Sequence, residues 1–364
     1  MQKSLTSSVQ LGPVPADLDD LRRISALCGQ DITMTQGAGG NTSIKHNGVL
    51  WIKASGTWLS KADRDDIFVP VDIAAELRRL DAGDADCMDS AILGKNEPRA
   101  SIEGPVHAAL PQRVVIHLHC VNTIAYAVRA DGQAKTAPKL EGLSWIWVPY
   151  RRPGAPLARI ILDLVTSGGG RPDVFILENH GLVVCGDTVD AATECLKVVR
   201  RRLSVEPTAA SMVRPAPRQS APAAYRWTDD ETIARLAFDA QARVIAAHGV
   251  LYPDHMVFLG PAFPEVRLNE DIGSALARWR AAFGAPPIYL VVPEVGVLVA
   301  ESAVPNTIAM LQCLGLVTAR LGSGNTGVEK LRYLSAADNA ELVNWDAEFY
   351  RQKLAMIHGR APGI

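Results

Sequence analysis

Three histidines and one glutamate in the first half of the sequence could gather around a metal ion. His117 and His119 are separated by one residue within 113–119, a short β-branched apolar run that predicts a strand. Because side chains alternate along a strand, both imidazoles point to one face and can bind the same ion. Zinc in a catalytic site usually takes three protein ligands and keeps one position open, so a third ligand is needed.

His180 could supply this third ligand, because it stands in the polar turn 178–181 directly after the apolar run 174–177. Glu103 adds a carboxylate close in sequence to the histidine pair. The alternative is that His117 and His119 lie in a sheet without metal, since a short motif of this kind also occurs by chance. The spacing of the pair alone does not decide between the two.

Two glycine-containing turns stand upstream of these residues. In 36–45, Gly37, Gly39 and Gly40 allow the backbone to turn tightly and to approach a ligand, and short polar residues follow them. This turn could be an anion-binding nest or an ordinary hairpin loop. It is neither a Walker loop nor a dinucleotide fingerprint, because it lacks the residues that those motifs require. A second small, polar turn lies at 54–57.

Alternating helix and strand patterns must position these side chains. The expected helices are 17–28, 73–80, 104–110, 122–130, 157–166, 189–203, 229–248, 270–283, 306–321 and 336–355. The expected strands are 49–53, 67–71, 113–119, 146–150, 174–177, 181–185, 288–292 and 295–300. Residues 254–260 are expected to form a strand followed by a turn. His107 lies one turn after Glu103, either as a packed histidine with satisfied hydrogen bonds or as a group that supports the ligands.

The composition is that of an ordinary soluble globular protein. The chain has 364 residues, of which 48% are hydrophobic and 21% charged, and this length favours about two domains. A net charge of −2 gives no reason to expect a nucleic acid or an anionic membrane as a partner. No apolar run is long enough for a membrane span, and the first residues lack the apolar segment of a signal peptide. The six cysteines form no CxxC pair, so we expect reduced thiols and a cytoplasmic location.

A change in composition divides the chain. Residues 204–224 carry four prolines among alanines and serines, which is typical of a linker or an extended surface segment. We therefore expect a metal-binding α/β domain in residues 1–206, a Pro/Ala-rich linker at 207–224 and a smaller α/β unit in 225–364.

The two parts end in similar sequences. Residues 172–185 align without a gap on 287–300, which places Gly181 on Gly296 and His180 on Val295. This pattern predicts a degenerate internal repeat whose second copy has lost the metal ligand. Two unrelated apolar hairpins are the alternative. The second unit would bind no metal, and would instead pack against the first unit, cover its site or hold subunits together.

Together, the motifs resemble those of the class II, zinc-dependent aldolases of the aldolase/adducin superfamily. They occur in the family's order at 39–43, 53–56, 101–103 with His107, 117–119, 147–150 with 153–154, and 179–181. The resemblance covers about residues 16–203 and implies α/β/α layers around a central, mostly antiparallel sheet. Residues 225–364 resemble the segment after the aldolase domain in rhamnulose-phosphate aldolase/dehydrogenase fusion proteins. Because no dehydrogenase domain follows in this sequence, hydride transfer is not expected.

The resemblance implies a role for each motif residue. The ligands of Zn2+, or of Mn2+ or Co2+, would be His117, His119 and His180, and the acid/base residue would be Glu103. The groups that hold a substrate phosphate would be Gly40, Asn41, Ser55, Gly56 and Ser101. The chain departs from the simpler sugar-phosphate aldolases at Ile102, where these often have a second phosphate-binding serine. The resemblance also implies a homo-oligomer, with a tetramer as one arrangement, whose neighbouring subunits contribute to the phosphate site.

The activity implied by the resemblance is that of a metal-dependent lyase acting on a ketose phosphate or a related hydroxy-keto compound. Breaking a carbon–carbon bond β to a carbonyl leaves an enediolate, whose charge a divalent metal stabilises while a carboxylate moves the proton. The same enediolate would serve a β-keto acid decarboxylase or a 4-epimerase. A non-catalytic adducin-like module and a metal-free structural protein are further alternatives. The three histidines and Glu103 favour an enzyme, because a binding module has no need for them.

Overall fold

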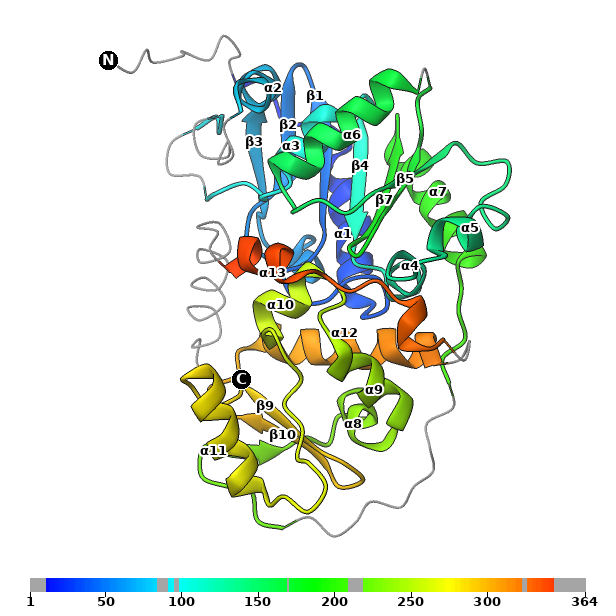
Figure 1. The fold of residues 1–364 in the computed structure, drawn as a ribbon. Coiled ribbons are helices and arrows are strands. Elements are labelled where there is room, and N and C mark those ends of the chain that lie inside the picture. Colours follow the sequence, from blue (N-terminus) through cyan, green and yellow to red (C-terminus); the bar gives the residue numbers. More distant parts are fainter. Residues whose placement is uncertain are drawn as a thin grey trace.

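The computed structural model describes residues 11–83, 91–94, 98–168, 170–208, 219–322 and 326–343. These residues form two α/β units, drawn one above the other in Figure 1. The first unit contains a seven-stranded sheet and the second a three-stranded sheet. Within the described residues, none of the helices combines the length and the apolar character that a membrane span requires.

The large sheet has the strand order β3-β2-β1-β4-β7-β6-β5. Its strands are β1 Asn41–His46, β2 Val49–Lys53, β3 Phe68–Asp72, β4 Val114–Leu118, β5 Trp145–Val148, β6 Val174–Leu177 and β7 Gly181–Gly186. Only β5 and β6 pair in parallel, and the other neighbouring pairs are antiparallel. The expectation of a mostly antiparallel central sheet is therefore confirmed.

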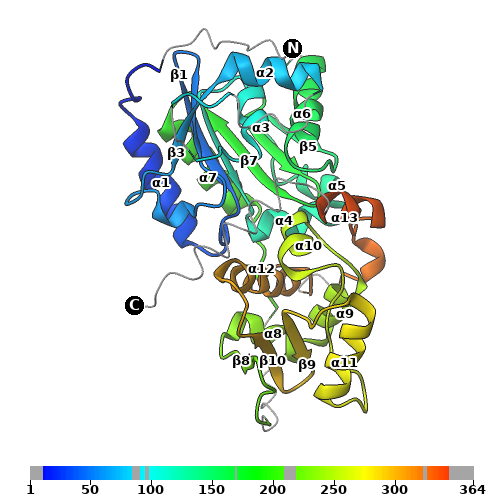
Figure 2. The same cartoon turned by 90° about the vertical axis from the view of Figure 1, so that its left-hand side faces the viewer.

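Helices cover both faces of this sheet, as the predicted α/β/α layers require (Figure 2). One face packs against α1 Leu18–Gln30 and α7 Val189–Arg202, and the other against α3 Gly104–Ala109 and α6 Ala155–Ser167, with α2 Ile73–Ala82 beside them. On β4, Ile116 and Leu118 belong to the first of these cores, whereas Val115 belongs to the second. His117 thus faces the side of α3, the helix that begins directly after Glu103.

The second unit is built on the order β8-β10-β9. Its strands are β8 Tyr225–Trp227, β9 Tyr289–Val292 and β10 Gly296–Ala300. Its helices are α8 Glu231–Phe238, α9 Ala240–His248, α10 Pro253–Leu259, α11 Ile272–Phe283, α12 Pro305–Gly322 and α13 Ala336–Val343. In Figure 1, α12 runs between the two sheets, where it packs against α8, α9, α10 and α4 Val121–Ala127. The first unit adds a short α5 at Gly132–Thr136, and two short 3-10 helices lie at Leu59–Lys61 and Val328–Lys330.

Two sequence-based expectations about the second unit were wrong. Residues 254–260 do not form a strand, because Pro253 occupies the first turn of α10 and Asp254 adds a negative charge there, both of which favour a helix. The single helix expected at 229–248 is divided at Asp239, whose backbone is extended and whose side chain caps α9 by accepting from the Ala242 N–H.

Two further expectations fall partly on residues that the structure does not describe. The helix expected at 336–355 begins at Ala336, as predicted, and its part beyond Val343 lies outside the described residues. Residues 209–218 of the predicted linker also lie outside them. The domain boundaries therefore stay a prediction.

The hairpins of the two units share one backbone register. In the first, β6 and β7 pair Leu177 with Gly181, and in the second, β9 and β10 pair Val292 with Gly296. The gap-free alignment of 172–185 on 287–300 equates these pairs. Both hairpins also pair antiparallel with a further strand, β4 in the first unit and β8 in the second.

The turns of the two hairpins also agree. Asn179 and Glu294, which the alignment equates, both have a positive φ, of 51° and 61°. The Asn179 N–H donates to the Ala127 carbonyl at 3.0 Å, and the Glu294 N–H donates to the Ala237 carbonyl at 2.9 Å. These carbonyls belong to α4 and α8, the helices that follow the equivalent strands β4 and β8. The alignment thus matches the backbone geometry, while common descent from a repeat stays a prediction.

Candidate metal centre

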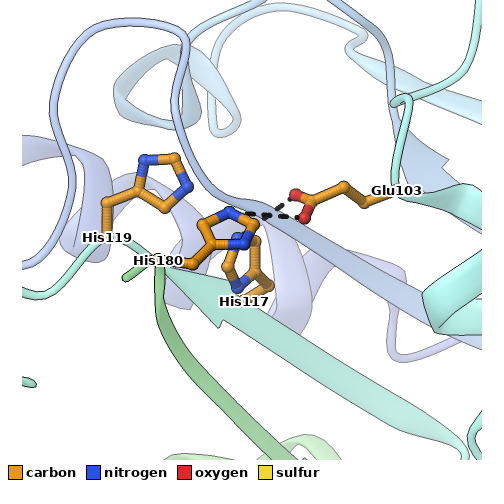
Figure 3. Close-up of side chains that lie close together, drawn as sticks. All are labelled: Glu103, His117, His119 and His180. Carbon is orange, nitrogen blue, oxygen red and sulfur yellow. Dashed lines mark ion pairs between the residues drawn. The ribbon is translucent and has the colours of Figure 1, made fainter. Parts of the chain in front are cut away.

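The structure brings together the four residues with which the sequence analysis began. His117, His119, His180 and Glu103 are buried, and one ligand atom from each lies within 4.8 Å of the others. The three imidazole centroids are 4.9 to 5.1 Å apart. Figure 3 shows the Glu103 carboxylate pointing toward His117 and His180. Their role as ligands stays a prediction, but their proximity is what that role requires.

The three histidines come from two parts of the chain, and backbone pairing brings them to one end of the sheet. His117 lies on β4 between two antiparallel neighbours, opposite Asn41 on β1 and Val183 on β7. His119 follows the end of the same strand, and His180 ends the turn between β6 and β7. A Cβ added at Gly181 would lie 2.5 Å from the Leu118 carbonyl oxygen, so only glycine lets this turn approach β4 so closely.

Hydrogen bonds fix which nitrogen of His117 faces the cluster. Its Nδ1 lies 3.0 Å from the Leu182 carbonyl oxygen, which can only accept, so Nδ1 carries the proton. Its Nε2 lies 3.2 Å from Oε2 of Glu103. In a neutral imidazole this nitrogen would present a lone pair to the carboxylate. The contact is therefore favourable only with a positive charge there, either a second proton on His117 or a metal ion shared by the cluster.

Glu103 is held by a chain of buried hydrogen bonds that the sequence analysis did not foresee. Asn41 Nδ2 donates to Oε2 of Glu103 at 2.8 Å. His107 Nε2 bonds to Oδ1 of Asn41, and the Ser43 hydroxyl lies 2.6 Å from Nδ1 of His107. Because the Asn41 oxygen can only accept, His107 donates from Nε2 and accepts from Ser43. Burial lowers the pKa of His107 to about 3, which keeps this imidazole neutral.

His107 is therefore both a packed histidine and a group that supports the cluster, the two roles that the sequence left open. Its hydrogen bonds are satisfied, and it fixes the Asn41 amide that orients Glu103. In this structure the Asn41 side chain, predicted to hold a phosphate, donates to Glu103 and bonds to His107, and its phosphate-binding role stays a prediction. Asn41 still lines the pocket beside the cluster, where it lies with the other predicted anion-binding residues.

Electrostatics leave Glu103 and His180 in the forms that a divalent cation requires, whereas His117 would have to bind the cation in place of a proton. Burial would raise the pKa of Glu103, but the neighbouring His117 and His180 outweigh it and hold this pKa well below its usual range. Burial would likewise lower the pKa of His117, but the Glu103 carboxylate raises it above its usual value. For His180 burial prevails and lowers the pKa to about 3. Glu103 is thus ionised and His180 neutral, and these are the protonation states that metal binding demands.

Unsatisfied ring nitrogens support a metal at this place. Among the residues that the structure describes, Nε2 of His117 and Nε2 of His119 are buried and make no hydrogen bond. Buried polar atoms without a partner are uncommon in native proteins and call for an explanation. Three imidazoles and a carboxylate are the donor set that zinc and similar divalent ions take. The residues present therefore fit a divalent metal.

A pocket opens beside the cluster and encloses about 390 Å³ of empty space, counting the part that is open to solvent. It is lined by Glu103, His119 and His180 and by all five predicted anion-binding residues, Gly40, Asn41, Ser55, Gly56 and Ser101. Ile102, the point of departure from the simpler aldolases, is also in its wall. The structure thus gathers the predicted substrate residues in one place, next to the predicted metal ligands.

The pocket wall contains two charged residues to which the sequence analysis gave no role. Lys53 is buried at the end of β2, and its ammonium donates to the carbonyl oxygens of Ala38 at 3.0 Å and Thr57 at 2.7 Å. It thereby joins the two glycine-containing turns. A lysine in the otherwise apolar strand 49–53 was the available signal, since a lysine is rarely buried without a partner. The second charged residue in the pocket wall is Asp254, from α10. No local sequence pattern indicated that Asp254 belongs to the site.

Comparisons with known proteins match about half of the chain. A family model described as Class II Aldolase and Adducin N-terminal domain matches residues 23–206. The curated protein "Uncharacterized oxidoreductase YuxG" of Bacillus subtilis is 31% identical over 202 residues, which are 52% of this chain but only 29% of that protein.

Two solved structures are also similar. The N-terminal class II aldolase domain of a conserved protein from Thermoplasma acidophilum has 26% identity and a TM-score of 0.45, covering 54% of this chain and 97% of that one. The L-fuculose-1-phosphate aldolase from Thermus thermophilus has 14% identity and a TM-score of 0.35, covering 51% of this chain and 92% of that one.

Proposed function

The chain belongs to the class II aldolase and adducin family, and from this premise we propose that it is a divalent-metal-dependent lyase. It would cleave a carbon–carbon bond in a phosphorylated ketose or a related hydroxy-keto compound. The observation that supports this most directly is the buried group of three histidines with Glu103. An adducin-like module without catalysis has no use for such a group, which is costly to bury without a cation.

The three histidines would hold the metal, with Zn2+, Mn2+ or Co2+ as candidates. The ion, when bound, would act as a Lewis acid toward the carbonyl of the substrate. The histidines are held in place for this role, because the Leu182 carbonyl sets the tautomer of His117 and all three rings are buried. A rigid ligand set of this kind is what keeps a coordination position open for a substrate.

Glu103 would move the proton. Asn41 holds one oxygen of its carboxylate, and the other lies 3.5 Å from Nε2 of His180, so the group has a fixed direction. It lines the pocket together with His119 and His180, within reach of a substrate bound beside the histidines. A carboxylate held in this way can accept a proton from a hydroxyl group and return it later in the cycle.

The far wall of the pocket would bind the anionic end of the substrate. Gly40 and Gly56 have positive φ angles of 63° and 76°, which suit tight turns that bring the backbone close to a ligand, and Ser55 and Ser101 add hydroxyls. The buried Lys53 ammonium supplies a fixed positive charge in the same wall. This combination favours a substrate with a phosphate. Ile102 restricts the number of hydroxyl donors, so we propose no specific sugar.

A product screen tests this proposal. The purified protein, loaded with Zn2+, Mn2+ or Co2+, would be incubated with ketose phosphates and β-keto acids, and the products identified by mass. Cleavage into two carbon fragments supports the lyase. Loss of carbon dioxide would instead identify a decarboxylase, and an isomer of unchanged mass a 4-epimerase. No turnover of either substrate group with any metal would contradict an enzymatic role. Light scattering on the same preparation would test the proposed homo-oligomer.

A further inference from the structure

The first turn of α10 brings one carboxylate of the second unit to the metal centre. Oδ2 of Asp254 lies 3.0 Å from Nδ1 of His119. Both residues are almost fully buried, with 3% of Asp254 and 7% of His119 exposed. Asp254 and the neighbouring Pro253 line the same pocket as Glu103 and His180. The contact therefore lies inside the candidate site and not on the outer surface of the molecule.

The contact places a carboxylate of the second unit beside the ring of His119. A histidine that binds a metal through one ring nitrogen almost always donates the N–H of the other to a carboxylate, a carbonyl or water. His117 satisfies this rule through the Leu182 carbonyl, and for His119 the carboxylate within reach of Nδ1 is that of Asp254, at 3.0 Å. A carboxylate so close to Nδ1 of His119 favours a proton on that nitrogen, because a lone pair there would be repelled. Its Nε2, which makes no hydrogen bond within the described part of the chain, is then the atom left for a metal.

We propose that Asp254 is a positioning residue of the metal centre, so that the second unit completes a site whose ligands all come from the first. This inference rests on the proposed metal-dependent function. It assigns the second unit a direct part in the site, beyond the covering or packing role expected from the sequence. Asp254 would act through His119 and not on the substrate.

The glycine turn of the first unit closes over the Asp254–His119 contact. A Cβ added at Gly39 would lie 2.8 Å from Nδ1 of His119 and 3.2 Å from Oδ2 of Asp254. Only a residue without a side chain fits at that distance. The Ala38 N–H of the same turn donates to Oδ1 of Asn306, at 3.2 Å, and Asn306 belongs to α12 of the second unit. The turn is thus held against the second unit next to the contact.

The second unit also fixes the turn that carries His180. Asn179 Nδ2 donates to the carbonyl oxygens of Leu251 at 2.8 Å and Arg332 at 2.7 Å. The Arg332 guanidinium lies 3.2 Å from Oε2 of Glu178 in the same turn. Two of the three histidine ligands therefore depend on groups of the second unit. Of these groups, Asp254 is the one that touches a ligand ring directly.

Metal affinity and a spectrum test this role without relying on turnover. The full chain would be loaded with Co2+, and its dissociation constant measured by competition with a chelator, alongside its visible absorption spectrum. Asp254→Ala should weaken Co2+ binding by roughly 10- to 100-fold, the usual effect of removing such a partner. Asp254→Asn keeps the shape and a hydrogen-bond acceptor, so it should weaken binding less. Both should shift the cobalt absorption bands, because the ligand field of His119 changes.

Asp271→Asn is the matched control, because Asp271 caps α11 far from the site and asparagine caps a helix equally well. It should leave the affinity and the spectrum unchanged. If the wild type binds Co2+ and both Asp254 variants bind it equally well with the same spectrum, the positioning role is wrong. If the wild type itself binds no Co2+, the proposed metal-dependent function fails, and this inference with it. If Asp254→Ala does not fold, the affinity and the spectrum of Asp254→Asn still test the positioning role.

Discussion

The hairpin around His180 and the hairpin around Val295 have the same backbone and different chemistry. Their strands pair in the same register, and their turns place a residue with positive φ at the same position. Yet Val295 stands where the first hairpin has His180. On the neighbouring strands, Trp227 pairs with Leu298 where His117 pairs with Val183. The alignment that equates the hairpins thus equates two predicted ligands with two apolar residues.

The difference teaches that strand pairing and the turn set the backbone here, while the side chains at the strand ends decide whether a metal can bind. Within the described residues, Glu103 with the three histidines is the one group able to hold a metal. The second unit takes part through Asp254, on a helix outside its own hairpin. In the first unit, the corresponding interval between α4 and β6 holds α5, β5 and α6.

Replacing His180 by valine should have the largest effect, because it gives the first hairpin the residue of the second. We expect the hairpin to form, since valine is already accommodated at the equivalent turn position. The metal, however, loses one of three protein ligands. Its affinity should fall by more than about 100-fold, which exceeds the effect of losing a supporting group alone. Elemental analysis after dialysis would measure this, and turnover should fall to background.

His46→Val is the matched control for this change, since His46 ends β1 outside the cluster and should leave the metal content unchanged. Metal retained at full occupancy in His180→Val would remove His180 from the ligand set. An unfolded His180→Val, with His46→Val folded, would show that the two hairpins tolerate their turn residues differently. The similarity of the two hairpins would then extend only to their backbone register.

Replacing Glu103 by glutamine should have the next largest effect. Within the described residues the second unit has no counterpart to Glu103, so the change tests what the cluster needs beyond metal binding. Glutamine keeps the shape but cannot take up a proton, so turnover should fall by about 10²- to 10⁴-fold while the metal stays bound. Glu294→Gln, in the exposed turn of the second hairpin, should leave turnover unchanged. Full activity of Glu103→Gln would exclude it from proton transfer.

The sequence predicted the framework of the site because its signals are local. Alternation along 113–119 placed His117 on one face of a strand, and the turn after 174–177 placed His180 at the strand end. It did not reveal β1, whose residues are polar except Ile44 and which becomes a strand by pairing with β2 and β4 on both sides. A polar run at a buried position is stabilised by partners that the sequence alone does not show.

The sequence could not reveal the supporting groups, because their contacts join distant parts of the chain. Asn41 reaches Glu103 across the sheet, and Asp254 reaches His119 from the other unit. The apolar run after Asp254 predicts a strand, but a short apolar run does not distinguish a buried strand from a helix segment. With α10 assigned as a strand, nothing pointed to Asp254 as part of the site.

Replacing Asn179 by glycine should have a moderate effect on stability and none on the backbone of the turn, because glycine accepts a φ of 51°. The change removes both donors to the Leu251 and Arg332 carbonyls. Buried acceptors without a donor should cost about 1–3 kcal/mol of the free energy of unfolding, measured by urea denaturation. Glu294→Gly makes the same backbone change at an exposed position, so the difference between the two variants isolates the lost hydrogen bonds. Equal losses would show that Asn179 does not hold the units together.

Replacing Val295 by histidine should have the smallest effect and tests the comparison from the other side. If backbone geometry were enough, restoring the aligned histidine would create a second metal site. We expect none, because Trp227 occupies the position of His117 on the neighbouring strand, and no group equivalent to Glu103 lies near it within the described residues.

Val295 is half-buried against Leu290 and its neighbours, so the free energy of unfolding should fall by at most about 1 kcal/mol. Zinc analysis should still give about one ion per chain. A second bound ion would mean that the second unit has kept more of the site than its side chains indicate.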